Sequence, residues 1–303
     1  MNLIALLIGL VIERLATQLF HWRRMLWMDH IIDYGFRQAE RLRKWPAIIP
    51  VLLLAAVLVL PVFAVIWWLG GTLAGFTYLL LAIVVLFFSF GPQDIGEQVD
   101  EYCTALEEED EEKLHDAAKA ILEDDVPEDV TARTGAVEAA VCVQANNRLF
   151  AVVFWFVVLG PLAAWAYRVT DLIRRRAVFN EERNEDGEVS SERIRDATES
   201  LHSWLAWIPA RLTAVGYAAA GHMDEAIAAL RAPAEDRDLS TSERSDRLLE
   251  RVGVAALALQ DQPDESPSER AIRGAQAATH LVFKLFLIWA VIIAVMTLTA
   301  LTQ

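Results

Sequence analysis

Residues 45–93, WPAIIPVLLLAAVLVLPVFAVIWWLGGTLAGFTYLLLAIVVLFFSFGPQ, contain no Asp, Glu, Lys or Arg. This run is more than twice as long as the roughly 20 residues that one helix needs to cross a bilayer. Gly70-Gly71 divides it, and Trp67-Trp68 comes just before, at the level where aromatic side chains gather at a membrane surface. The stretch therefore predicts two helices of a membrane hairpin, over 47–69 and 72–90.

Further apolar segments lie on both sides of this hairpin. Residues 1–20 are apolar apart from one adjacent acid–base pair, and 149–167 carry no charge. Residues 204–222 are apolar around a single arginine, which fits either a further membrane helix or a re-entrant one. Residues 281–301 predict the last membrane span.

The charge is concentrated in one segment outside these apolar stretches. The chain carries a formal net charge of −15 although 55% of its residues are hydrophobic. Residues 91–148 hold seventeen Asp and Glu against four Lys and Arg, a net charge of −13. The hydrophobic fraction excludes a disordered chain, the sign of the charge excludes an ordinary nucleic-acid binder, and two cysteines exclude a disulfide scaffold. An integral membrane protein with acidic parts in water accounts for both properties.

We therefore expect an all-α fold, namely a polytopic helical membrane protein with cytoplasmic amphipathic helices. The excess of bases in 21–45 places that loop on the cytoplasmic side, and the even number of crossings that follows places the acidic segment there too. Apolar residues recur at helical spacing over 95–123 and predict one or two amphipathic helices. The organisation is membrane helices with the basic loop (1–90), an acidic helical segment (91–148), a fourth membrane helix with a polar connection and a Pro-Ala-Arg helix (149–222), a polar helical segment (223–280) and a C-terminal membrane helix (281–303).

The topology after residue 148 is open. If 149–167 crosses the membrane, Arg168 and Arg174-Arg175-Arg176 lie outside, against the positive-inside tendency. In one alternative, 149–167 and 204–222 both cross, with a short external loop between them. In the other, one of the two dips into the membrane and returns.

Polar and charged residues within or beside the apolar segments are the candidate site residues, because each is costly to insert unless it faces a bundle interior or a cavity. Snorkelling to the interface and structural ion pairs are the alternative explanations. The candidates are Glu13, Arg14, Asn146, Asn147, Arg148, Trp155, Tyr167, Arg168, Asp171, Trp204, Pro209, Arg211 and Thr213.

Arg211 is the best single candidate for binding an anion. It lies two residues after Pro209, in the middle of an apolar stretch, and a guanidinium can bind two oxygens of a phosphate or carboxylate. The acidic residues Asp124, Asp125, Glu128 and Asp129, with His115 nearby, favour solvated surface charge over a divalent-metal site. No nucleotide-binding or metalloprotease motif is present, and we expect no metal site.

Three motifs carry a resemblance to a known family. They are Ile-Glu-Arg-Leu at 12–15, Phe-Trp-Phe-Val-Val-Leu-Gly-Pro-Leu-Ala-Ala-Trp-Ala-Tyr-Arg at 154–168, and Leu-Ala-Trp-Ile-Pro-Ala-Arg-Leu-Thr-Ala-Val-Gly-Tyr-Ala at 205–218. Together, and in this order, they resemble the AmpE family of Gram-negative inner-membrane proteins, which is associated with induction of the AmpC β-lactamase. The resemblance extends from the first span to the last.

A wider resemblance links this family to the cobalamin-pathway membrane enzyme CobD/CbiB, an ATP-dependent ligase. The shared helices imply an inherited intramembrane site that includes Trp155, Tyr167, Arg168, Pro209, Arg211 and Thr213. The chain departs from the enzyme at 123–129, 144–148 and 169–172, where the ligase has the residues expected to hold ATP and metal. The resemblance therefore implies a regulator more strongly than an enzyme, with ATP and magnesium as cofactors only on the ligase alternative.

We thus expect a non-enzymatic regulatory protein of the bacterial inner membrane, linked to β-lactamase induction and to sensing of peptidoglycan recycling. Its expected partners are the lipid bilayer, an anionic small molecule and an AmpD-type amidase or another signalling protein, with self-association left open and nucleic acid excluded. The alternative is a ligase of the adenosylcobinamide-phosphate synthase type, or a degenerate relative of it. A transporter is a third alternative, which the lack of an inverted repeat disfavours.

Overall fold

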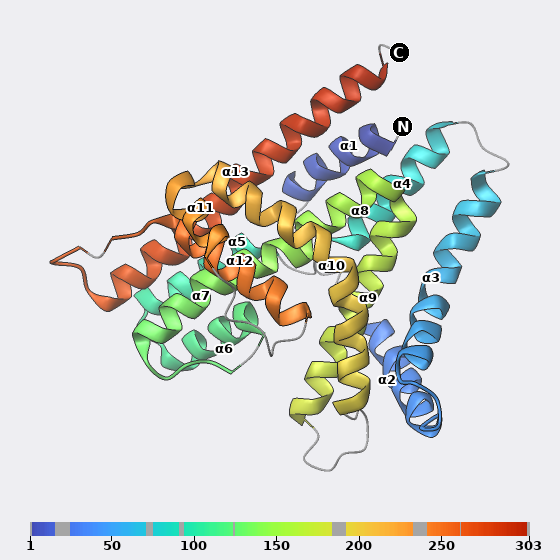
Figure 1. Ribbon diagram of the computed structural model, residues 1–303, viewed down its shortest axis with the longest axis horizontal. Coiled ribbons are helices and arrows are strands. Elements are labelled where there is room, and N and C mark those ends of the chain that lie inside the picture. Colours follow the sequence, from blue (N-terminus) through green and yellow to red (C-terminus); the bar gives the residue numbers. More distant parts are fainter. Residues whose placement is uncertain are drawn as a thin grey trace.

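Every regular element in the described residues is a helix, and the prediction of an all-helical membrane fold is confirmed. The computed structural model describes residues 2–15, 25–70, 75–90, 94–123, 125–183, 192–232, 241–260 and 262–301 (Figure 1). The helices are α1 (Asn2–Leu15), α2 (Leu26–Arg41), α3 (Ile48–Gly70), α4 (Gly75–Ser89), α5 (Ile95–Glu107), α6 (Glu111–Leu122), α7 (Val130–Ala145), the π-helical turn η2 (Asn146–Phe150), α8 (Ala151–Leu159), α9 (Pro161–Arg183), α10 (Glu192–Ala220), α11 (Met223–Arg231), α12 (Thr241–Leu257) and α13 (Pro267–Leu301).

Within these described ranges, three helical stretches are long and apolar enough to cross a membrane. They are Ile48–Trp68, Val130–Leu159 and Pro267–Thr299, and Thr77–Ser89 is a shorter apolar helix. In the apolar 18-residue window of the first and of the last stretch only 28% is buried inside the protein, against 72% in that of the middle stretch. Thus α3 and α13 present apolar side chains to their surroundings, as lipid contact requires, while α7–α8 forms the centre of the bundle.

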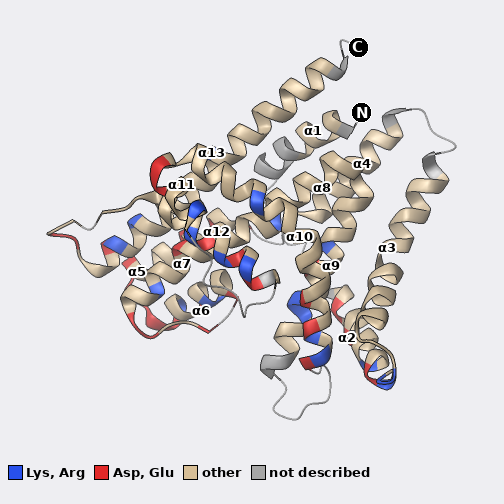
Figure 2. Ribbon diagram, in the orientation of Figure 1, with Lys and Arg blue, Asp and Glu red and all other residues tan. Residues whose placement is uncertain are grey.

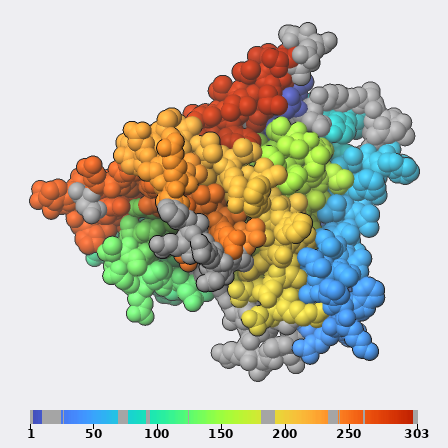
Figure 3. Space-filling view, viewed as in Figure 1, coloured from blue at the N-terminus to red at the C-terminus, as the bar shows by residue number. Residues whose placement is uncertain are grey.

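Charged residues gather away from the outer helices. Figure 2 shows acidic and basic residues on α5, α6, α7 and α12 and along the lower parts of α9 and α10, whereas α3, α4 and the distal half of α13 are nearly free of them. In the space-filling view α13 projects from the top of the body, and α3 lies along its right edge (Figure 3). The molecule therefore divides into an apolar part and a charged part, as the composition predicts.

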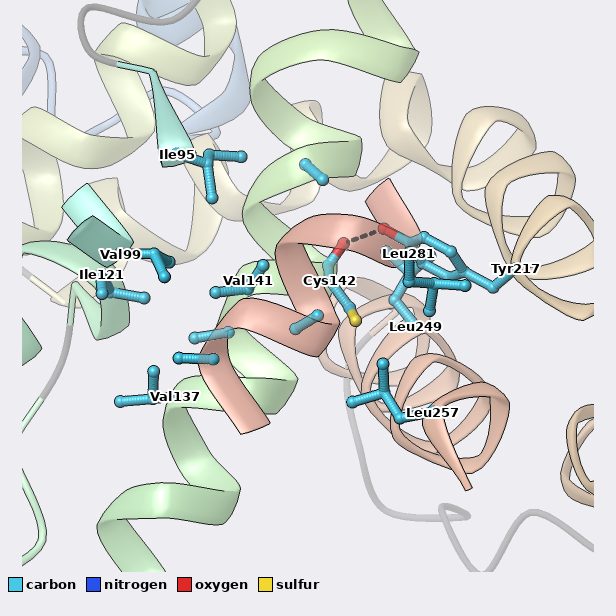
Figure 4. Close-up of a cluster of buried hydrophobic side chains, with 14 of the residues drawn as sticks. Ile95, Val99, Ile121, Val137, Val141, Cys142, Tyr217, Leu249, Leu257 and Leu281 are labelled. Atoms are coloured by element: carbon cyan, nitrogen blue, oxygen red, sulfur yellow. Dashed lines mark hydrogen bonds between the residues drawn. The ribbon is translucent and has the colours of Figure 1, made fainter. Parts of the chain in front are cut away.

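The charged part has an apolar core of its own. Buried side chains of α5, α6, α7, α10, α12 and α13 pack together, including Val137, Val141, Leu249 and Leu281 (Figure 4). The Tyr217 hydroxyl donates to the Cys142 carbonyl oxygen at 2.7 Å and joins α10 to α7. Asp94, Asp110 and Asp129 cap the N-termini of α5, α6 and α7 with their carboxylates.

The apolar segment 149–167 is not one helix. Gly160 interrupts it with φ 86° and ψ −170°, and Pro161 begins α9. This backbone conformation is essentially restricted to glycine, and proline favours the first position of a helix. The chain reverses direction at this point. The reversal is seen in the hydrogen bond that Arg175 of α9 donates to Gln144 of α7, which lies before the turn.

The turn at Gly160 makes 149–167 part of a helical hairpin and not one straight helix. Residues 144–159 and 161–175 form the two arms of a helical hairpin, so Arg168 and Arg175 return to the level of Arg148. The return arm ends against α2, where the Arg176 guanidinium donates two hydrogen bonds to Asp33, at 2.8 and 2.6 Å. The arginines after the apolar segment therefore lie on the same side as the basic α2.

Other boundaries differ from the sequence expectation in length. The last helix, expected from residue 281, begins at Pro267. The segment 204–222 belongs to a longer helix, α10, which begins at Glu192 and has Pro209 inside it. Polar residues that pack within the protein let these helices continue past the end of the hydrophobic pattern.

The turn gives a direct test of the hairpin. Substitution Gly160→Ala places a Cβ on a backbone conformation that side chains strain, and we expect it to lower the free energy of unfolding by about 1–3 kcal/mol. The measurement is thermal unfolding of the purified protein in detergent. The matched control is Gly135→Ala in α7, where a Cβ would meet no atom within 4 Å. There the better helix propensity of alanine should raise stability by about 0.5–1 kcal/mol; equal effects of the two substitutions would contradict the assignment of the turn.

Candidate functional site

Arg148 stands at the centre of a buried polar site. It lies in η2, and single π-helical turns are frequent at functional sites because they re-aim side chains. Its guanidinium donates to Gln98 at 2.6 Å, to Gln144 at 3.1 Å and to Glu123 at 2.7 Å. Two helices, α5 and α7, and the end of α6 thus converge on one side chain that is only 5% exposed.

Asp171, on the return arm of the hairpin, is the second centre. It is fully buried and accepts hydrogen bonds from Arg168 Nη1 at 2.7 Å and Arg175 Nε at 3.0 Å. Arg174 Nη2 donates to its other oxygen at 3.2 Å. The spacing of three and four residues along α9 puts these side chains on one face of the helix.

Arg175 joins the two centres. Its Nη1 lies 2.5 Å from Glu123 Oε1 while its Nε donates to Asp171. We call the resulting group the arginine cluster, and its members are Arg148, Arg168, Arg174, Arg175, Glu123 and Asp171. Four guanidinium groups in it face two carboxylates.

The field of the arginines determines the protonation of their acidic neighbours. Burial would raise the pKa of Glu123, but Arg175, Arg148 and Arg174 outweigh it and hold this pKa at about 2. For Asp171, burial likewise opposes ionisation, and Arg175 and Arg168 outweigh it to hold the pKa well below the usual range. Both carboxylates are therefore ionised at neutral pH.

Asp246 of α12 is a third carboxylate within the electrostatic reach of the cluster. Burial raises its pKa to about 6, against the opposing effect of Arg174. The cluster thus keeps an excess of two positive charges when Asp246 is protonated and of one when it is ionised.

Beside the cluster lie buried polar groups without hydrogen-bond partners in the described residues. They are the Tyr167 hydroxyl, both ring nitrogens of His202, and the Nε atoms of Arg168 and Arg174. Burial, followed by the charge of Arg174, lowers the pKa of His202 to about 3, so its ring is neutral. Buried polar groups are nearly always paired in proteins, and exceptions mark functional places.

A pocket of about 280 Å³ opens on the cluster. Its lining combines charged groups with an apolar wall: Lys119, Glu123, Arg174, Arg175, Val178 and Phe179. Two of the four guanidinium groups therefore reach a cavity, and the arrangement is suited to holding an anion.

The structure brings together several residues that the sequence proposes as a site. Arg148, Arg168 and Asp171 belong to the arginine cluster, and the ring of Tyr167 lies 5.3 Å from that of His202 beside it. A separate buried network joins α10 to η2, in which Thr213 donates to Asn146 at 3.0 Å and Asn146 donates to Asn147 at 2.9 Å.

The remaining candidates lie apart from the pocket. Trp155 donates to the Leu205 carbonyl oxygen at 3.0 Å, and Trp204 is 78% exposed. The guanidinium of Arg211 stacks on the Trp207 ring at 3.9 Å and donates to the Trp207 carbonyl oxygen, on the outside of α10, two residues after Pro209. The side chains of Glu13 and Arg14 lie outside the described residues.

Sequence reasoning did not single out Glu123, Gln98, Gln144, Arg174, Arg175 or His202 as members of a site. For α9 the signal was present, since Asp171 precedes Arg174 and Arg175 by three and four residues, the spacing of helical ion pairs. For Glu123 no local signal exists, because it is one acid among seventeen in 91–148. Among the described residues no group of three His, Cys, Asp or Glu is placed to hold a metal ion.

Comparison with known proteins gives two findings. The family model described as "Regulatory signalling modulator protein AmpE" matches residues 1–301. A "Cobalamin biosynthesis protein CobD" from Stutzerimonas stutzeri (strain A1501) is 27% identical over 161 residues, which is 53% of this chain and 50% of that protein. The chain thus matches about half the length of this relative. No solved structure matches it closely enough for comparison.

Removing the charge of Asp171 tests how much the cluster depends on it. In Asp171→Asn three arginines lose their buried partner, and we expect unfolding to become easier by about 3–5 kcal/mol. The readout is the thermal midpoint and the yield of folded protein in detergent. In the control Glu108→Gln, which removes an exposed partner of Lys113, the loss should stay below about 1 kcal/mol. A loss that small in Asp171→Asn would show that the cluster does not need this carboxylate.

The pH dependence of stability tests the electrostatic effect of the arginines on Glu123. Because its folded-state pKa is depressed to about 2 from 4.5, its contribution is complete above about pH 4.5 and is lost as the pH falls toward 2. The stability advantage of the wild type over Glu123→Gln should therefore shrink on acidification through this window. Thermal midpoints of both proteins at a series of pH values measure it, and a constant difference between them would contradict the assigned pKa.

Proposed function

The chain belongs to the AmpE family, and on this premise we propose that it is an inner-membrane, multi-pass signalling protein that couples an anionic small molecule to β-lactamase induction. The coarse function, a regulatory signalling modulator, is that of the family. The finer proposal is that the ligand reports on peptidoglycan recycling and binds at the arginine cluster.

The excess positive charge at the pocket is the observation that carries this proposal. Burying guanidinium groups is costly, and a purely structural ion-pair network would be expected to balance its charges. Here four guanidinium groups face two ionised carboxylates, and Arg174 and Arg175 reach a cavity. Planar guanidinium groups bind carboxylate and phosphate oxygens in pairs, so an anion would complete the charge balance.

The orientation of the hairpin supports a pocket open to the cytoplasm. The rise from Arg148 to Leu159 is about 16 Å at 1.5 Å per residue, roughly half of a 30 Å hydrocarbon core. A hairpin of this length dips into the membrane and returns, which keeps Arg168 and Arg174–Arg176 beside the basic α2. The pocket would then receive a ligand from the side where basic loops lie.

The acidic helices α5 and α6 supply a surface for a signalling partner. They carry seven exposed acidic residues against two lysines, and an AmpD-type amidase is the partner that the family association favours. The exposed apolar side chains of α3 and α13 contact the bilayer. The same two helix faces could also pair with a second copy of the chain within the membrane.

A ligase of the cobalamin type is the second candidate function. The partial match to a cobalamin biosynthesis protein favours it, together with Trp155, Arg168, Pro209, Arg211 and Thr213, which the resemblance implicates. Magnesium-dependent binding of ATP that is lost in Arg211→Ala would favour this candidate over the regulator.

Complementation of a deletion strain separates these possibilities. We expect deletion to weaken β-lactam-induced β-lactamase activity, wild type and Arg211→Ala to restore it, and Arg175→Gln to restore less than about a tenth, because a buried charge-assisted contact is lost. Membrane protein levels, measured by immunoblot, exclude loss of folding as the cause. Unchanged induction in the deletion strain would overturn the signalling proposal, and equal failure of both variants would point away from this pocket.

A further inference from the structure

Glu123 occupies the mouth of the pocket in a way that helix termination does not require. It ends α6 with φ 57° and ψ 20°, the left-handed conformation. Glycine is the usual residue there, and any other residue bears a cost of roughly 1–2 kcal/mol. Strained backbone positions cluster at functional sites, so the position of Glu123 motivates a functional interpretation of its side chain.

The carboxylate of Glu123 does what a bound anion would do. One oxygen, Oε1, accepts from Arg148 Nη2 at 2.7 Å and lies 2.5 Å from Arg175 Nη1. Its side chain is 24% exposed and lines the pocket, whereas Asp171 behind it is fully buried. Of the two carboxylates in the cluster, Glu123 is thus the one that an incoming ligand can reach.

The charge and size of the pocket select the ligand class. At neutral pH Asp246 is mostly ionised, so the excess is one with Glu123 in place and two once Glu123 is displaced. A phosphate monoester carries about −1.5 to −2 at neutral pH and matches an excess of two, whereas a carboxylate offsets only one charge. The volume of about 280 Å³ lies just below the range typical of pockets that enclose a whole drug-sized ligand, roughly 300–1,000 Å³. The site is suited to a head group, with Val178 and Phe179 beside the rest of the molecule.

From these observations we infer that the pocket formed by Lys119, Arg174 and Arg175 binds a phosphate group, and that Glu123 is a built-in competitor that the phosphate displaces from Arg175. This inference rests on the proposed function for the identity of the site. Displacement removes the contact that ties the end of α6 to α9 and leaves Glu123 held by Arg148 alone, so binding loosens the last turn of α6. The phosphate belongs either to a soluble phosphomonoester or to a lipid head group.

The first experiment is binding of inorganic phosphate to the full-length protein in a phosphate-free detergent, measured by calorimetry at neutral pH. Removing the competing charge in Glu123→Gln should tighten binding about tenfold. Glu138→Gln is the matched control, because Glu138 is a buried carboxylate paired with Arg270 away from the pocket, and binding should not change. Unchanged or weaker binding in Glu123→Gln, or no binding to either protein, would overturn the inference.

Two further variants protect the test against loss of folding. Glu123→Gly also removes the carboxylate but suits the left-handed backbone, so it should bind phosphate as tightly as Glu123→Gln. Lys119→Gln, on an exposed position of α6, should weaken binding about tenfold, whereas Lys113→Gln near the start of the same helix should not. Equal affinities of the two lysine variants would count against the pocket.

Hydrogen exchange reports on the release of α6. Phosphate should speed exchange of the amides in the last turn of α6 in the wild type, and in Glu123→Gln these amides should already exchange fast. Protection of the same amides by phosphate would refute displacement.

The source of the phosphate is resolved in nanodiscs. If nanodiscs that contain phosphatidic acid weaken binding of glycerol phosphate, compared with nanodiscs of phosphatidylcholine alone, the phosphate group belongs to a lipid head group. If glycerol phosphate binds equally in both kinds of nanodisc, the phosphate group belongs to a soluble ligand. If β-lactamase induction is unchanged in the deletion strain while the purified protein shows these binding changes, the proposed function is wrong and the phosphate site is still supported.

Discussion

The fold depends on keeping four guanidinium groups inside a helical body. Each such group, taken from water, costs several kcal/mol unless carboxylates and further hydrogen bonds compensate for the lost hydration. Arg148 meets this requirement with three acceptors from three different elements, and Asp171 meets it for three arginines at once. The packing of α5, α6, α7 and α9 against one another is therefore fixed by polar geometry as well as by apolar burial.

That geometry in turn requires the chain to reverse direction inside an apolar segment. Without the turn at Gly160, an uninterrupted helix from residue 149 to 175 would carry Arg168 about 30 Å and Arg175 about 40 Å from Arg148 at 1.5 Å per residue, and no common carboxylate could serve them. With the turn, Gln144 of one arm and Arg175 of the other are in contact. The reversal also brings Arg176 of α9 beside Asp33 of α2.

The sequence predicts the elements well and their convergence poorly, for a physical reason. Long charge-free apolar runs identify α3, α4 and the last helix, and hydrophobic periodicity identifies α5 and α6, since both signals are local in the sequence. It also marks Arg148, Arg168 and Asp171 as unusual, because each stands beside an apolar run. Their meeting depends on a backbone conformation at a single glycine and on contacts such as Arg148 with Gln98, 50 residues apart, which no local pattern encodes. Arg211 looks more central in sequence than it is, because the indole ring of Trp207 provides a surface for its guanidinium outside the bundle.

The acidic segment acquires a role from this arrangement. A net charge of −13 over 91–148 repels anions from the surrounding water, so an anion reaches the pocket only if the local excess of arginines outweighs that field. Glu123 is the acid of this segment that ties α6 to Arg148 and Arg175, and it follows directly on the last residue of α6. On the phosphate proposal, a ligand that competes for those guanidinium groups acts first on the end of α6, which lies within the acidic segment. The same proposal makes the end of α6 the place where occupancy of the pocket would be converted into a change that a partner in water can sense.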